Sequence, residues 1–259
     1  TRYLQTLEEE GQPLPDLESI IRITSSGATF SGEQKSLLQK YMPNATIIDM
    51  LGASEGGPFG IAMTAPNEDP IATAVFIAPP NAVTFNDETW EPLPRGSSTP
   101  GVLGVSGPMP QGYFRDEAKS AQTFKVINGV RYTIPGDYAL INEQGVMQLL
   151  GRGSVCINSG GEKIYPEEVE VAARSIAGIA DCTVVGVPDD RFGNAVTAVV
   201  SRLPGATVTT EELLSEMRKT LAAYKCPRHV LFVDAVYRSP SGKADYNITR
   251  DIAINLLKS

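Results

Sequence analysis

The sequence contains very little histidine, cysteine or tryptophan. Its 259 residues include one histidine, three cysteines and one tryptophan. The cysteines, Cys156, Cys182 and Cys226, are odd in number and far apart, and His229 is the single histidine. This set predicts neither a disulfide framework nor a zinc site. We therefore expect buried free thiols in a reducing cytoplasm.

An excess of basic residues is also absent. Lysine and arginine number 22 against 30 aspartates and glutamates, and the formal net charge is −8. This balance argues against a nucleic-acid partner. Apolar stretches such as residues 71–80 are too short to cross a bilayer, so we expect no integral membrane segment. The first ten residues do not resemble a signal peptide, and a start without methionine indicates a fragment of a longer polypeptide.

The pattern changes along the chain in a way that predicts an α/β protein with a β-rich segment. Residues 1–60 predict an α/β unit of helix, strand, helix and strand, with the last three elements over 20–24, 32–41 and 46–51. Residues 61–151 predict a β-barrel-like segment or a strongly bent sheet, because short β-rich runs alternate with Pro, Gly and Asn. These runs are 72–78, 83–86, 102–106, 124–127, 130–134, 138–142 and 146–150.

Residues 152–259 predict a small α+β domain with its own core. Pro166 begins a helix over 166–177 with apolar residues at helical spacing. Thr209 and Glu212 form a capping-box pattern that predicts the start of another helix. Strands are expected over 183–187, 195–201 and 230–237, and a last helix over 248–257. The domains are therefore expected to be 1–151 and 152–259, with a boundary near 151–154.

Five glycine-containing turns each carry a charged residue. Because glycine lacks a Cβ, such turns let the backbone approach a phosphate or a sugar closely. Taken singly, each turn has an ordinary alternative: a solvated loop side chain, an Asx turn or a plain β-turn. The charged residues are Glu55, Asp137, Arg152, Lys163 and Lys243, and they follow Gly52-Ala53-Ser54, Gly136, Gly151, Gly160-Gly161 and Gly242.

The chemistry of these residue types indicates a nucleotide site. Glu55 can hold Mg²⁺ against phosphate oxygens, and Ser54 can donate a hydrogen bond to an α-phosphate. Asp137 can accept hydrogen bonds from both hydroxyls of a ribose, and the guanidinium of Arg152 suits ribose or phosphate oxygens. Lys243 can neutralise charge that develops on a reacting phosphate and carboxylate.

In this order the turns resemble the core motifs of the AMP-forming adenylating enzymes, which include acyl-CoA synthetases, luciferases and the adenylation domains of peptide synthetases. The chain departs from the family at Leu51, Ser54 and Pro135, where the family commonly has an aromatic residue and two threonines. The most specific match lies within 151–170, where the residues at the family's spacing are Ile157, Gly161, Lys163, Ile164, Pro166, Glu168 and Glu170.

The resemblance implies cofactors and site residues. It implies ATP or AMP, Mg²⁺ and coenzyme A as the bound molecules. Lys243, Ser54 and Glu55 are expected to be catalytic, with Glu55 as the metal ligand. Asp49 is expected to take the adenine amino group in place of the missing aromatic contact. The expected cofactor-binding residues are Gly27, Ala28, Asp49, Asp137, Arg152, Lys163, Gly160 and Gly161.

The resemblance also implies that the small domain moves about a hinge near Ser154. After adenylation, rotation is expected to withdraw Lys243 and to bring in the loop Ser159-Gly160-Gly161, whose backbone would line a pantetheine tunnel. His229 is given no catalytic role.

The expected activity is that of an AMP-forming acid–CoA ligase. The sequence of residues 151–170 resembles that of a bacterial, often actinobacterial, subgroup of fatty-acid–CoA ligases. Some of these ligases act on steroid side-chain acids. A long-chain fatty acid or a bulky apolar acid is therefore the expected substrate, with coenzyme A as acceptor. A homodimer is the candidate assembly.

Two alternatives stay open. One is an adenylation domain that delivers its acyl group to a carrier protein. The other is a fragment that binds a nucleotide or a partner without catalysis, because the sequence has no Ser/Thr/Gly-rich triphosphate loop ending near a lysine. The resemblance covers only the C-terminal portion of a family member, so a missing N-terminal portion of the same polypeptide is an expected partner, and the isolated fragment is expected to be inactive.

Overall fold

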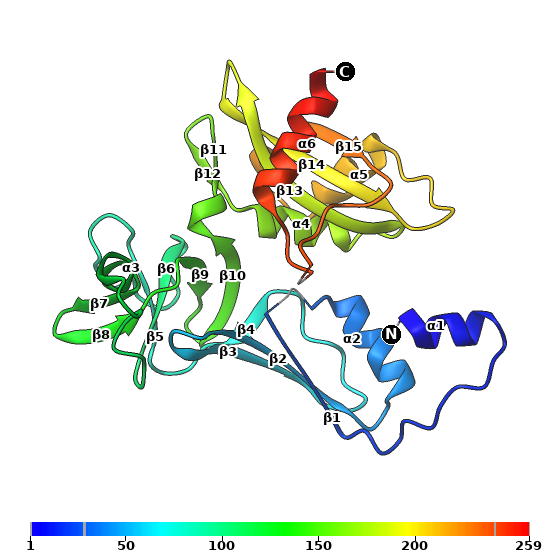
Figure 1. Cartoon of the computed structure of the whole chain (residues 1–259), viewed down its shortest axis with the longest axis horizontal. Coiled ribbons are helices and arrows are strands. Elements are labelled where there is room, and N and C mark those ends of the chain that lie inside the picture. Colours follow the sequence, from blue (N-terminus) through cyan, green and yellow to red (C-terminus); the bar gives the residue numbers. More distant parts are fainter. Residues whose placement is uncertain (1, 28–29, 241, 259) are drawn as a thin grey trace. The chain divides into compact units, whose positions relative to one another are not determined.

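The computed structural model describes residues 2–27, 30–240 and 242–258. The chain divides into two compact units, Thr1–Leu149 and Leu150–Ser259 (Figure 1). Among the described residues, no helix is both long enough and apolar enough to cross a membrane.

The first unit begins with an α/β segment. It contains α1 (Arg2–Glu9), β1 (Arg22–Ser26), α2 (Gly32–Tyr41), β2 (Thr46–Ala53) and β3 (Gly57–Thr64). Strands β1 and β2 are parallel, and β3 returns antiparallel to β2. Ser31 caps α2 through a capping box with Gln34, which satisfies backbone N–H groups at the helix start. The predicted helix over 32–41 is confirmed, whereas β3 was not predicted.

The rest of the first unit is β-rich. It contains β4 (Val75–Ile77), β5 (Ala82–Phe85), β6 (Gly101–Ser106), α3 (Glu117–Thr123), β7 (Phe124–Ile127), β8 (Val130–Thr133), β9 (Asp137–Ile141) and β10 (Val146–Arg152). All its strands join β1–β3 in one ten-stranded sheet of order β1-β2-β3-β4-β10-β9-β6-β8-β7, with β5 paired to β6. This path is open and mixed in direction, so the sheet forms no closed barrel among the described residues, and the barrel-like form stays a prediction.

Two apolar clusters stabilise this sheet. Burying such side chains contributes roughly 25 cal/mol per Å² of apolar surface removed from water. The smaller cluster surrounds Phe85, whose ring meets the edge of Tyr132 with 5.0 Å between ring centroids. The larger cluster comprises Phe59, Ala62, Phe76, Ala78, Ala82, Leu103, Val105, Ala139, Ile141 and Met147.

The second unit is a sheet with helices on both faces. It contains the 3₁₀ turn η1 (Gly153–Val155), β11 (Ile157–Ser159), β12 (Glu162–Ile164), α4 (Pro166–Arg174), β13 (Ile179–Asp189), β14 (Gly193–Arg202), α5 (Thr210–Met217), η2 (Ala223–Lys225), β15 (His229–Phe232) and α6 (Tyr246–Lys258). Strands β13 and β14 are antiparallel, and β15 is parallel to β14. The hairpin of β11 and β12 is a separate two-stranded sheet.

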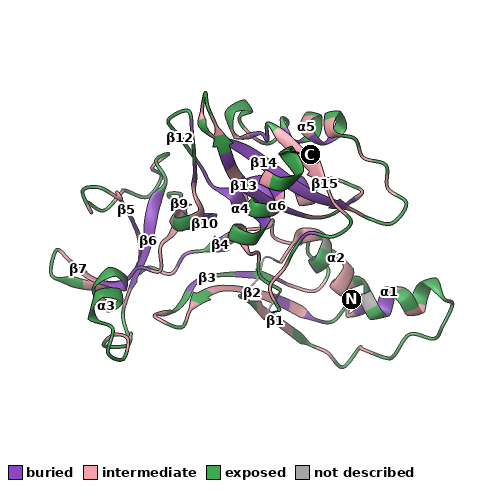
Figure 2. Ribbon diagram, turned by 45° about the horizontal axis from the view of Figure 1, so that its top comes forward, coloured by how far each residue is buried: buried purple, intermediate pink, exposed green. Residues whose placement is uncertain are grey.

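Alternate residues of β13 and β14 face two separate cores. Val184 and Val196 pack with α4 and α5, including the fully buried Leu213. Val185 and Val199 pack with Ala253 of α6 on the opposite face. Burial on both faces explains the nearly continuous apolar runs of these strands, and Figure 2 shows buried residues along both.

The predicted elements of this unit are all present, with different ends. The first helix stops at Arg174 rather than at 177, and the last helix begins at Tyr246, two residues earlier than predicted. The capping box of Thr209 and Glu212 is confirmed. Strands β11 and β12 were not predicted, because three residues each are too few for a periodic pattern.

Candidate functional site

Glu55 lies in a hairpin turn that two distant residues hold in place. Strand β2 continues through Ala53, so the turn comprises Ser54, Glu55 and Gly56; the prediction that Gly52 and Ala53 belong to the turn was wrong. Thr133 of β8 donates its hydroxyl to the carbonyl of Glu55 at 2.9 Å. The side chain of Thr133 leaves no room for a Cβ at Gly56, which would lie 2.9 Å from it.

The carboxylate of Glu55 has its own partner. The hydroxyl of Tyr113 donates a hydrogen bond to Oε1 of Glu55. This bond, helped by burial, raises the pKa of Tyr113, which keeps the phenol protonated. Tyr113 is not among the residues predicted from the sequence. It lies 58 residues from Glu55 in a loop, and no local pattern in the sequence marks it.

Asp137 lies close to this turn along the chain path. It is the first residue of β9 and follows Gly136, whose φ of +91° needs a glycine. Asp137 is four residues from Thr133, and four extended residues span at most about 14 Å. The backbone of Asp137 therefore lies within about 14 Å of Thr133, which contacts the carbonyl of Glu55.

Asp49, the residue predicted to contact adenine, is buried in the first unit. Its side chain is 7% exposed and forms an ion pair with the buried Lys35 of α2, with Nζ 3.1 Å from Oδ2. Burial raises the pKa of Asp49, and Lys35 opposes that shift. This place in the interior favours a structural role in the α/β segment, and contact of Asp49 with adenine stays a prediction.

The remaining residues predicted in the first unit are at a strand end. Gly27 follows β1 with a φ of +83°, and Ser26 donates its hydroxyl to the carbonyl of Met50 at 2.9 Å. Ala28 lies outside the described residues.

In the second unit, Lys243 is carried by a closed hairpin. Arg238 and Ala244 form the bridge at its base. Inside it, the N–H of Ser239 donates to the carbonyl of Lys243 at 2.9 Å, and the N–H of Gly242 donates to the carbonyl of Ser239 at 2.8 Å. Gly242 has a φ of +79°. Lys243 follows this turn directly, and its side chain is exposed. We call residues 238–244 the lysine hairpin.

Gly160 and Gly161 form the turn between β11 and β12. Both have positive φ, +60° and +91°, as a two-residue hairpin turn of the primed type requires. The N–H of Gly160 donates to the carbonyl of Phe192 at 2.9 Å, and the guanidinium of Arg228 covers the Phe192 ring at 3.5 Å. Lys163 is exposed on β12, in the same hairpin as the two glycines.

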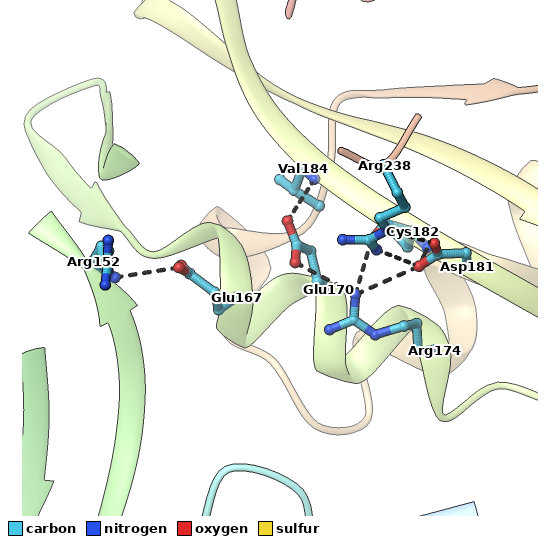
Figure 3. Close-up of polar contacts among 8 residues, drawn as sticks. All are labelled: Arg152, Glu167, Glu170, Arg174, Asp181, Cys182, Val184 and Arg238. Atoms are coloured by element: carbon cyan, nitrogen blue, oxygen red, sulfur yellow. Dashed lines mark hydrogen bonds and ion pairs between the residues drawn. The ribbon is translucent and has the colours of Figure 1, made fainter. Parts of the chain in front are cut away.

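Arg152 ends β10, and its side chain is exposed. Its backbone N–H donates to Oε1 of Glu167 at 3.3 Å (Figure 3). Gly151 has a φ of +130°, which favours glycine, and a Cβ there would lie 2.0 Å from Oε2 of Glu167. Ser154, the predicted hinge residue, lies in η1 directly after this contact.

The chain resembles known proteins over most of its length. The sequence model of the family described as AMP-binding enzyme C-terminal domain matches residues 168–243. A medium/long-chain-fatty-acid–CoA/3-oxocholest-4-en-26-oate–CoA ligase of Mycolicibacterium smegmatis is 45% identical over 92% of this chain and 43% of its own length. The chain belongs to the adenylate-forming ligases.

Two further members of the adenylate-forming ligases are similar along the same region. The 3-oxocholest-4-en-26-oate–CoA ligase of Rhodococcus rhodochrous is 43% identical over 94% of this chain and 44% of its own length. The crystal structure of ATP-bound MatB from Rhodopseudomonas palustris matches with a TM-score of 0.75 and 30% identity, over 90% of this chain and 45% of that one. The chain therefore spans less than half the length of the relatives it matches.

The side chains around Glu55 suit Mg²⁺, the metal that membership of the adenylate-forming ligases implies. Within residues 2–27, 30–240 and 242–258, no group of three or more His, Cys, Asp or Glu side chains is placed to hold a metal ion. Mg²⁺ is commonly bound through one or two carboxylates together with waters and substrate phosphates. A carboxylate such as that of Glu55, oriented by Tyr113, therefore suits Mg²⁺ that arrives with a nucleotide.

Proposed function

We propose that this chain is the C-terminal part of an AMP-forming acid–CoA ligase. The whole enzyme converts ATP, a carboxylic acid and coenzyme A into acyl-CoA, AMP and pyrophosphate. One observation carries the proposal: 45% identity over 92% of the chain to a ligase named for this reaction class. The family match also ends at Lys243, the residue to which we assign the chemistry.

The proposed roles follow from the chemistry of each residue type and from the family resemblance. In the first half-reaction the carboxylate oxygen attacks the α-phosphorus of ATP and pyrophosphate leaves. Lys243 neutralises the developing negative charge, and Ser54 donates to the α-phosphate. Glu55 holds Mg²⁺, which supplies charge neutralisation at the phosphates. Asp137 binds the ribose hydroxyls, and Gly27 and Ala28 line the adenine and acyl pocket.

The second half-reaction forms the thioester. The thiol of coenzyme A attacks the acyl carbonyl of acyl-AMP, and AMP leaves. We assign Gly160, Gly161 and Lys163 to coenzyme A, because the two-glycine turn brings backbone close to a narrow ligand. Arg152 binds ribose or α-phosphate oxygens through its guanidinium.

The proposal includes two domains, 1–151 and 152–259, joined at a hinge near Ser154. Lys243 and the Gly160-Gly161 turn belong to one compact unit, so a rotation of that unit would exchange them at a single site. This exchange would let one site catalyse both half-reactions.

The proposed acid is a long-chain fatty acid or a bulky apolar acid such as a steroid side-chain acid. Both ligases at 43% and 45% identity are named for 3-oxocholest-4-en-26-oate. The location proposed is the cytoplasm, in keeping with Cys182 and Cys226 as free thiols.

The missing N-terminal portion of the polypeptide is the proposed partner of the first unit. Three large apolar side chains, Ile61, Met63 and Ile77, are 36%, 57% and 55% exposed on β3 and β4, and Ile61 pairs directly with Ile77. Such a patch indicates a surface that another segment covers. The barrel-like closure of 61–151 would then be completed by strands of that portion. A homodimer stays a prediction.

The decisive experiment is Lys243→Ala in the full-length ligase. We expect the rate of acyl-AMP formation, measured as pyrophosphate release, to fall by orders of magnitude. The reason is that a charge partner of the transition state is lost. Thioester formation from supplied acyl-AMP should be retained. Lys219→Ala, which removes an exposed lysine of the same unit, is the control. Equal loss of both half-reactions would refute the exchange of loops.

The two alternatives give different outcomes. An adenylation domain that serves a carrier protein would form acyl-AMP and fail to form acyl-CoA. A fragment without catalysis would release no pyrophosphate either alone or within the full-length polypeptide. Activity confined to the full-length form supports the proposal.

A further inference from the structure

Arg238, at the base of the lysine hairpin, forms a bidentate contact with strand β13. Arg238 donates from Nε to Oδ2 of Asp181 at 2.8 Å and from Nη2 to Oδ1 of the same carboxylate. Its Nη2 also donates to the carbonyl of Cys182 at 3.3 Å. Asp181 and Cys182 belong to β13, which pairs with β14 in the three-stranded sheet of the unit. A bidentate arginine–carboxylate pair fixes direction as well as distance.

The same carboxylate has a second arginine partner. Nη1 of Arg174, on α4, lies 3.7 Å from Oδ1 of Asp181 and 3.4 Å from Oε2 of Glu170, and it donates to the carbonyl of Cys182 at 2.9 Å. Figure 3 shows both arginine side chains converging on Asp181 from α4 and from the lysine hairpin. Two acids and two arginines balance in charge, so the cluster is neutral.

The cluster also reaches the far side of the hairpin. Glu170 is 2% exposed and accepts the N–H of Val184 at 3.0 Å. Tyr246 is the first residue of α6 and follows Lys243 by three residues. Burial and the nearby charge of Glu170 raise the pKa of Tyr246. Burial raises the pKa of Glu170, which the charge of Arg174 and the hydrogen bond from Val184 oppose.

We infer that Arg238, Asp181, Arg174, Glu170 and Tyr246 form a clamp that holds both ends of the lysine hairpin and thereby directs Lys243. Arg238 is then a positioning residue, which acts on the reaction only through Lys243. The physical reason is that three hydrogen bonds close the hairpin itself, while the pair of Arg238 with Asp181 joins its base to β13. This inference rests on the proposed function of Lys243.

The first test uses this chain and needs no activity. In Arg238→Gln we expect the amides of Ser239, Gly242 and Lys243 to exchange hydrogen at least about tenfold faster, because a loosened base lets the hairpin open locally. Lys225→Gln is the matched control. It breaks the ion pair of Lys225 with Glu168, whose side chains are 20% and 16% exposed against 26% and 28% for Arg238 and Asp181. Unchanged exchange in Arg238→Gln would overturn the inference.

The second test uses the full-length ligase. Arg238→Gln should lower kcat of acyl-AMP formation by about 10²-fold with little change in KM for ATP, because a displacement near 1 Å of a reacting group costs that much. Thioester formation from supplied acyl-AMP should be unchanged. Arg238→Lys should recover only part of the rate, since an ammonium cannot bond both carboxylate oxygens in a fork. A purely structural role would lower both half-reactions in parallel.

The outcomes separate this inference from the proposed function. If Lys243→Ala leaves acyl-AMP formation intact, the proposed function fails. If Lys243→Ala abolishes it while Arg238→Gln does not lower it, only the clamp is wrong. Should Arg238→Gln fail to fold, Asp181→Asn replaces it. That variant keeps the shape of the side chain and removes the charge. Hydrogen exchange of the hairpin amides and the rate of acyl-AMP formation then test the inference.

Discussion

At the scale of single residues, the buried charges of Lys35 and Asp49 form an ion pair whose location explains it. Lys35 and Asp49 join α2 to β2 in the interior of the first unit. Lys35 also donates to the carbonyl of Ile71 at 3.3 Å. An isolated charge in such a place would be costly, since little solvent reaches it. The pair is therefore a condition for packing α2 on the sheet.

Breaking this pair should destabilise the first unit strongly. Lys35→Met leaves a buried, unpaired carboxylate, and we expect a loss of about 3–5 kcal/mol in the free energy of unfolding, measured with urea. Because burial raises the pKa of Asp49, the variant should regain stability as pH falls and that carboxyl takes up a proton. Lys40→Met, at the exposed pair with Glu8, should change stability little. A loss that does not depend on pH would contradict the explanation.

Tyr113 should govern how well Glu55 binds metal. Tyr113→Phe removes the hydroxyl that orients the carboxylate, so we expect the half-saturating Mg²⁺ concentration of the full-length ligase to rise several-fold. Glu55→Gln should weaken Mg²⁺-dependent turnover further, because it removes the charged ligand. Tyr224→Phe, an exposed tyrosine at 51%, is the control. Metal dependence equal to that of the parent in Glu55→Gln would show that the metal assignment is wrong.

At the scale of elements, α2 in the first unit and α5 in the second begin at capping boxes of different chemistry. Thr209 and Glu212 close the box at α5, with the Thr209 N–H donating to Oε2 of Glu212 at 2.9 Å. Ser31 and Gln34 close the box at α2, where the Ser31 N–H donates to Oε1 of Gln34 at 3.1 Å. Only the box at α5 contains a group that titrates.

The box at α5 should therefore make stability depend on pH. Hydrogen bonds from Thr209 lower the pKa of Glu212 below its ordinary value of 4.5. The stabilisation is complete above that value and is lost as pH falls through the lowered pKa. Glu212→Gln should remove this part of the acid dependence, and Thr209→Ala should cost about 1 kcal/mol at neutral pH. Ser31→Ala should lower stability without changing its acid dependence. Thermal unfolding across pH 3–7 checks all three.

At the scale of the whole molecule, the cores of the second unit use only its own residues. The cluster around Leu213 and the cluster around Ala253 both lie within residues 150–259. A domain with its own core can fold alone.

Residues 150–259 expressed alone should therefore unfold cooperatively. We expect one urea transition, monitored by circular dichroism, with the same midpoint as the corresponding transition of the whole chain. Leu213→Ala, at a fully buried position, should lower its stability by about 2–5 kcal/mol. A gradual, uncooperative loss of signal in the unmodified segment would contradict this independence.

The sequence by itself determined the features that depend on neighbouring residues. The helix over 32–41, the capping box of Thr209 and Glu212, and glycines such as Gly136 and Gly242 follow from local backbone geometry, and the family resemblance follows from motif spacing. Only the tertiary structure decided that Tyr113 donates a hydrogen bond to Glu55 and that Asp49 pairs with Lys35. It also decided that β3 joins the sheet and that Arg238 binds Asp181. These contacts join residues far apart in the chain. A local sequence pattern does not specify which distant side chains come within hydrogen-bonding distance when the sheet packs.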